Sequence, residues 1–87
     1  MTTVGGEIGQ LQALYASFER EAQAVQELAV RIRGELDRTW WTGAAADRFR
    51  SSWGAEFEPA LRRLHAALAE AGTEVHRRTE ALLEAGS

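Results

Sequence analysis

The sequence predicts an all-α fold: two long helices that pair antiparallel as a hairpin, with a Trp-x-Gly turn between them. Apolar residues recur at alternating intervals of three and four over both halves of the chain, which is the spacing of a packed helix face. Trp41-Thr42-Gly43 marks the one break between these halves. No run of alternating polar and apolar residues indicates a strand. Together these observations favour a helical hairpin over any sheet fold.

The first helix is expected over about residues 7–40. Its apolar face continues for the full length of this stretch, and Leu14 and Leu28 lie beside the face and widen it. Charged and amide residues fill the opposite face, as in a helix that is half solvated. The expected face consists of Ile8, Leu11, Tyr15, Phe18, Ala22, Val25, Ala29, Ile32 and Leu36.

The turn is expected at residues 41–43. Gly43 can adopt backbone angles denied to other residues, so the chain can reverse there. Trp41 supplies a large ring to cover the apolar end of the hairpin, and Thr42 is expected to cap the second helix. Because consecutive side chains on a helix point about 100° apart, Trp40 and Trp41 cannot both face inward. Trp40 is therefore a possible exposed contact for a partner.

The second helix is expected over about residues 44–85. Pro59 lies inside it, where proline loses one backbone hydrogen bond and clashes with the carbonyl of Ala55. This leaves two interpretations, one kinked helix or two helices with Pro59 in the first turn of the later one. We favour the kink, because the apolar stripe keeps its spacing from Phe57 to Leu61. That stripe consists of Phe49, Trp53, Phe57, Leu61, Leu64, Leu68, Ala71, Val75, Thr79 and Leu82.

The 87 residues allow one small domain, residues 1–87, with little surface to bury. Two helices cover only part of each other's apolar stripe, and burial stabilises by roughly 25 cal/mol per Å². We therefore expect two hairpins to pair into a dimeric four-helix bundle. The expected core and dimer face consists of Leu11, Tyr15, Phe18, Val25, Ile32, Leu36, Phe49, Trp53, Phe57, Leu61, Leu64, Leu68, Val75 and Leu82.

Composition and spacing argue against several classes of function. The net charge of −3 gives no electrostatic footprint for nucleic acid. The chain has no cysteine, and His65 and His76 lack metal-ligand spacing, so no metal or cofactor is expected. A two-helix hairpin offers no cleft for acid–base chemistry by Glu56 and Glu58, so no enzyme is expected. We expect neither a cleavable signal peptide nor a membrane-spanning run, and no membrane partner.

The residues WWTGAAADRFRSSW, between two long helices in a chain of this length, resemble the WXG100 (ESAT-6-like) family. The likeness covers essentially the whole chain, and Phe57, Leu61 and Leu64 fit the aliphatic run that follows the motif. The resemblance implies small helical hairpins that form homodimers or heterodimers with a similar chain. It also implies export without a cleavable signal by type VII (ESX) secretion machinery, as a substrate or a co-secreted partner.

Many exported members of that family carry a tyrosine followed four residues later by an acid. The nearest match here is His76 with Glu80, in which the acid fits and histidine replaces the tyrosine. Either the histidine substitutes, or a partner chain supplies the export signal. Two other functions stay open: a helical adaptor or chaperone-like partner of a larger secreted toxin or effector, and a membrane-active helical protein whose apolar faces act after release.

Overall fold

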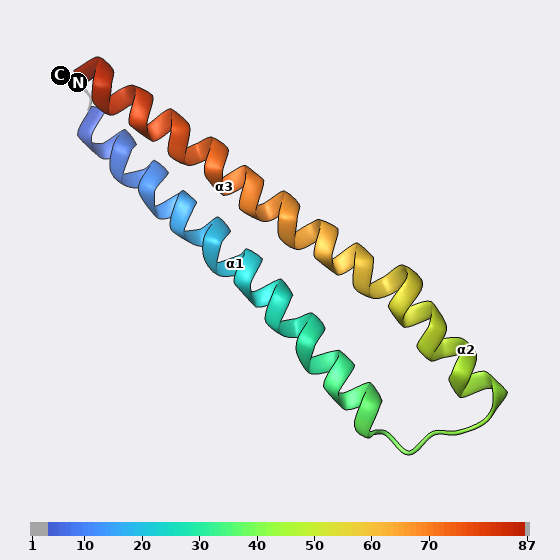
Figure 1. Cartoon of the computed structure of the whole chain (residues 1–87). Helices are drawn as coiled ribbons and strands as arrows, with labels where there is room; N and C mark the ends of the chain where they lie inside the picture. The colour runs from blue at the N-terminus through green and yellow to red at the C-terminus, as the bar shows by residue number, and fades with distance from the viewer. Residues whose placement is uncertain (1–3, 87) are drawn as a thin grey trace.

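The chain forms an extended antiparallel hairpin, which confirms the predicted all-α class. A computed structural model describes residues 4–86. Helix α1 (Val4–Arg38) forms one arm, and α2 (Ala44–Ser52), the π-helical turn η1 (Trp53–Phe57) and α3 (Glu58–Gly86) follow one another without a break as the other arm. Figure 1 shows the two arms side by side, with both termini at one end and the connecting loop at the other. The hairpin measures 65 × 17 × 15 Å.

The inner face of α1 follows the three-and-four spacing of its apolar residues. Ala22 is almost fully buried, with 4% of its surface exposed. The larger side chains on the same face keep part of their surface in solvent. Leu11, Tyr15, Phe18, Val25, Ala29 and Leu36 are all half-buried. The seam is close-packed where residues are small: a Cβ added to Gly72 of α3 would lie 3.1 Å from the Cβ of Phe18.

The π-helical turn η1 lies directly before Pro59 and accommodates it. The backbone N–H of Glu58 bonds to the carbonyl of Trp53, five residues back, where a regular helix would bond four residues back. In a regular helix the ring of Pro59 would clash with the carbonyl of Ala55. The wider turn removes this conflict, so the second arm continues through the proline as one helix.

The π-helical turn also shifts which residues face α1. The inward positions of the second arm run Ala46, Arg50, Trp53 and then Glu58, an interval of five where the rest of the arm shows three or four. Beyond it Leu61, His65, Leu68, Gly72, Val75, Thr79 and Leu82 lie against α1. The stripe therefore changes register between Trp53 and Glu58, and Phe57, which the sequence interpretation placed in the stripe, is 48% exposed. Leu64 is consequently 46% exposed, while His65 is half-buried.

The isolated hairpin has little core. Within the part of the chain whose side chains are described, the buried residues are small or polar: Ala22, Ala46, Glu58, Gly72 and Thr79. The radius of gyration is 19.4 Å, against about 12 Å for a compact domain of this length. The accessible surface is 6268 Å², against about 5,100 Å² for a compact monomer of this mass. The excess surface suggests an oligomerising partner.

Candidate interaction surfaces

The loop between the arms, residues 39–43, is held by local backbone bonds. The N–H of Thr39 donates to the carbonyl of Leu36 over 3.4 Å, and that of Trp41 donates to Thr39 over 3.0 Å. Gly43 has φ 108°, a left-handed value that other residues rarely adopt. It is the N-cap residue of α2 and makes no side-chain capping bond. The expectation that Thr42 caps this helix is therefore wrong, since the cap comes one residue later and glycine is chosen for its backbone angle.

Arg50 ties the loop to α2. Its guanidinium donates to the carbonyls of Trp41 at 2.7 Å, Thr39 at 3.0 Å and Leu36 at 3.2 Å. The last carbonyls of a helix have no partner within it, and a cation there is also favoured by the helix dipole. One side chain thus completes the end of α1 and fixes the backbone on which Trp41 stands.

A row of aromatic rings runs from the loop along the second arm. The ring centroids of Trp41 and Phe49 are 5.8 Å apart, those of Phe49 and Phe57 are 6.3 Å apart, and those of Phe57 and Trp53 are 6.4 Å apart. Trp41, Phe49 and Phe57 are each between 41% and 48% exposed. Trp40 stands outside this row and is 94% exposed. The loop end therefore presents large apolar rings to solvent.

Glu58 is a buried carboxylate that joins both arms. Only 4% of the residue is exposed. Its Oε1 accepts from Nε of Arg33 at 3.0 Å and from the indole N–H of Trp53 at 2.8 Å. Its Oε2 pairs with the guanidinium of Arg33 and with Nη2 of Arg62 at 2.7 Å. Each oxygen has two partners, so the buried charge is satisfied.

Two faces of the hairpin flank the seam between its arms. We call the polar face the side on which Arg33 and Arg62 lie next to the seam residues Tyr15, Glu58 and His65. In either arm, the side chain one position before a seam residue points about 100° away from it. Because the arms are antiparallel, these preceding side chains lie on the same side of the hairpin in both arms, opposite the polar face. The residues that precede Tyr15, Ala29, Arg33, Glu58 and His65 are apolar, whereas those that precede Ala22, Leu36, Val75 and Thr79 are charged. We call the apolar ones the apolar face: Leu14, Leu28, Ile32, Phe57 and Leu64.

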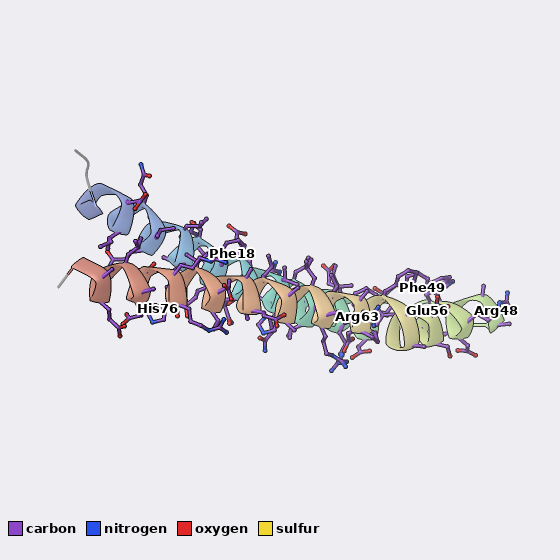
Figure 2. The ribbon with its side chains drawn as sticks, turned by 90° about the horizontal axis from the view of Figure 1, so that it is seen from above. Phe18, Arg48, Phe49, Glu56, Arg63 and His76 are labelled. Atoms are coloured by element: carbon purple, nitrogen blue, oxygen red, sulfur yellow. The ribbon has the colours of Figure 1, made fainter. Side chains whose placement is uncertain are left out.

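The members of the apolar face are between 36% and 48% exposed. The aromatic row extends this face to the loop end through Phe49. Figure 2 shows Phe49 on the edge of the molecule opposite that of His76, which belongs to the polar side. Exposure of such an apolar surface to water is unfavourable, and a surface of this kind is typical of a protein–protein contact.

The polar face is held by contacts between the arms. Nδ1 of His65 lies 2.8 Å from the carbonyl of Ala22; since a carbonyl only accepts, this nitrogen carries the hydrogen. The rings of Tyr15 and His76 are 5.0 Å apart. The hydroxyl of Tyr15 donates to Glu19 at 2.9 Å. This hydrogen bond, with desolvation and the repulsion between two anions, raises the pKa of Tyr15 above its ordinary value.

The possible export residues lie on the same side. Nε2 of His76 is 3.7 Å from Oε2 of Glu80, and both side chains are about half exposed. The ring of Tyr15 packs against His76 from the other arm. The histidine and the acid are therefore accessible together on the surface of α3.

The structure separates the fourteen residues expected on the core and dimer face into two groups. The half-buried ones lie in the seam: Leu11, Tyr15, Phe18, Val25, Leu36, Trp53, Leu61, Leu68, Val75 and Leu82. The more exposed ones lie on the apolar face and its aromatic extension: Ile32, Phe49, Phe57 and Leu64. The turn residues Trp41, Thr42 and Gly43 lie in the loop, next to Trp40.

Sequence reasoning missed two polar residues. Glu58 stands three residues before Leu61, so heptad spacing counted backward from Leu61 would have placed it in the seam. Counting forward from Trp53 pointed to Phe57 instead, because the extra residue of η1 is invisible in the pattern. Arg50 gives no local signal at all, since the carbonyls that it binds lie 9–14 residues earlier in the chain.

Within residues 4–86, no three histidine or acidic side chains gather as metal ligands would, and no helix is both long and apolar enough to cross a bilayer. Comparison with protein-family models, curated proteins and solved structures found no match for this chain. The surfaces described above are one apolar face, one polar face and an aromatic loop end.

Proposed function

We propose that this chain is a WXG100-like protein of a type VII secretion system, a non-enzymatic substrate or co-secreted partner that acts by helical dimerisation. The observation that carries the proposal is the apolar face. Leu14, Leu28, Ile32, Phe57 and Leu64 expose apolar surface along a hairpin whose fully buried residues are small or polar. A second hairpin, from another copy or from a similar chain, is the partner whose shape and chemistry fit this stripe.

The family part of the proposal rests on the sequence around the loop. Trp41-Thr42-Gly43 lies between the two arms, and Gly43 has the positive φ that lets the chain enter α2 directly. Trp40 and Trp41 are exposed at this end, where secretion machinery can contact them. His76 with Glu80 is the proposed export signal of this chain, and both are accessible on α3.

The dimer is tested by sedimentation of the full chain over micromolar concentrations, which we expect to show a dimer. A stable, folded monomer would exclude the two-hairpin bundle. Mixing the chain with a similar small helical chain encoded beside it separates a homodimer from a heterodimer. A stable complex with a larger toxin instead would favour the adaptor function.

Secretion is tested separately by measuring the protein in culture supernatant before and after deletion of the type VII ATPase. We expect secretion to stop. Unchanged secretion would remove this part of the proposal and leave the dimer untouched. Glu80→Ala, with Glu74→Ala as the control, tests whether this chain supplies the signal or whether a partner does.

A further inference from the structure

A groove of about 400 Å³ lies between the arms on the polar face, beside the π-helical turn. We call it the arginine groove. Its basic and polar walls carry Arg33 and Gln26 on α1 and Arg62 and His65 on α3. Ala29, Val30 and Leu61 supply apolar surface, and Glu58 lies at its base. Pairing of two hairpins through the apolar face would leave this groove open, because it is on the opposite side.

The groove carries a positive charge in a chain whose net charge is −3. Arg33 and Arg62 contribute two cations, and Glu58 contributes one anion. A guanidinium has five N–H donors, and Glu58 occupies two from Arg33 and one from Arg62. The two arginine side chains are 57% and 65% exposed. Their remaining donors can thus meet an anion from solvent.

Both arginines are already held in place. Glu58 is buried and has two partners on each oxygen. It therefore holds both guanidinium groups in place, but its single negative charge balances only one of their two positive charges. A ligand then orders fewer side chains on binding, which lowers the entropic cost. Next to this fixed pair, Val30 is 66% exposed. The site therefore combines a preorganised cationic wall with an apolar patch.

We propose that the arginine groove binds the carboxylate of an acidic residue on a partner protein segment, with an adjacent apolar side chain of that segment against Val30. The chemistry of the groove favours this ligand. Guanidinium groups bind carboxylates with paired hydrogen bonds, and one excess positive charge matches one carboxylate. The apolar surface of Val30, Ala29 and Leu61 suits a protein side chain. The inference does not depend on the dimer or on secretion.

The test uses the full chain, labelled with nitrogen-15, and a short capped peptide of alanine and glutamine that carries one leucine beside one glutamate. The control peptide has glutamine in place of the glutamate. We expect the glutamate peptide to bind at least about tenfold more tightly, as a charge-assisted pair gives. It should shift the indole N–H resonance of Trp53, which shares the carboxylate of Glu58 with both arginines. Equal binding of the two peptides would overturn the proposal.

Arg62→Gln and Arg63→Gln remove the same charge from neighbouring positions, but only Arg62 lines the groove. Arg33 and Trp53 still hold Glu58 when Arg62 is changed, and unchanged helical circular dichroism checks that the variant is folded. We expect Arg62→Gln to abolish the preference for the glutamate peptide and Arg63→Gln to keep it. Equal effects of the two variants would show a diffuse charge effect and would also overturn the proposed site.

Discussion

The two faces of the hairpin differ in how far contacts within the chain account for their side chains. On the polar face, Glu58 and His65 find their partners on the opposite arm or on their own. On the apolar face, Leu28 and Leu64 remain 39% and 46% exposed within the described part of the chain. Contacts on the polar face therefore align the two arms, and the exposed apolar face suggests an oligomerising partner.

This division has a physical basis. Hydrogen bonds and ion pairs are directional and require one register between the arms. Apolar contact is non-directional, and its contribution grows with the area removed from water. Two paired helices shield the surface between them, but they cannot shield the apolar surface on the outside of the pair. Four substitutions, each with a matched control, test this division between contacts within the hairpin and contacts with a second molecule.

Leu64→Asp should weaken self-association by more than about a hundredfold, because it would bury an unpaired charge in the proposed contact between hairpins. Leu83→Asp is the control, because Leu83 is also a leucine and is 44% exposed, against 46% for Leu64. It follows His76 by seven residues, which is two helical turns, so it lies on the polar side. Sedimentation equilibrium measures both. Equal weakening by the two variants would show that the apolar face is not the contact.

Glu58→Ala should lower the free energy of unfolding by about 2 kcal/mol, because it removes charge-assisted hydrogen bonds to Arg33, Arg62 and Trp53. The estimate is at the low end for a buried ion pair, since both arginines are more than half exposed and regain water. Glu56→Ala, at an exposed site, should change it by less than about 0.5 kcal/mol. Urea unfolding at one fixed protein concentration compares them.

Arg50→Ala should lower the free energy of unfolding by about 1 kcal/mol, because three carbonyls around the end of α1 lose the guanidinium donor. The carbonyls of Leu36 and Thr39 keep a backbone donor, which limits the loss. Arg48→Ala removes the same charge from an exposed neighbour and should leave stability nearly unchanged. Faster amide exchange at residues 39–42 in the Arg50 variant would locate the effect. Unchanged exchange there would contradict the role of Arg50 in holding the loop.

The smallest expected effect is on the pKa of Tyr15, without a change in the fold. The raised pKa follows from the hydrogen bond to Glu19, so the phenol stays protonated to a higher pH than usual. Glu19→Gln should lower the pKa of Tyr15 toward its ordinary value, and Glu21→Gln should not. The chain has one tyrosine, so ultraviolet difference spectroscopy reads this residue directly. A pKa that is the same in both variants would contradict the bond.

Much of the hairpin was predictable because its causes are local. The spacing of Leu11, Phe18 and Val25 fixes the inner face of α1, and a helix is the structure in which that spacing lines up. The two long apolar stretches and the break between them predicted two antiparallel arms. A dimer remains a prediction, although the exposed apolar face and the excess surface of the hairpin point in that direction.

The parts that escaped prediction depend on contacts distant in the sequence. Pro59 signalled a disturbance, but the spacing of apolar residues did not reveal that a π-helical turn precedes it or that Glu58 meets Arg33 of the other arm. The placement of Arg50 depends likewise on the path of the loop.

The sequence by itself determined that this chain is a helical hairpin with an apolar stripe on each arm, because periodicity is a property of neighbouring residues. Only the tertiary structure decided which side of the second arm turns inward. The single extra residue in η1 rotates α3 so that Glu58 and His65 face α1 while Phe57 and Leu64 face solvent. A buried carboxylate with four donors holds that register, and such a site exists only once the two arms have come together.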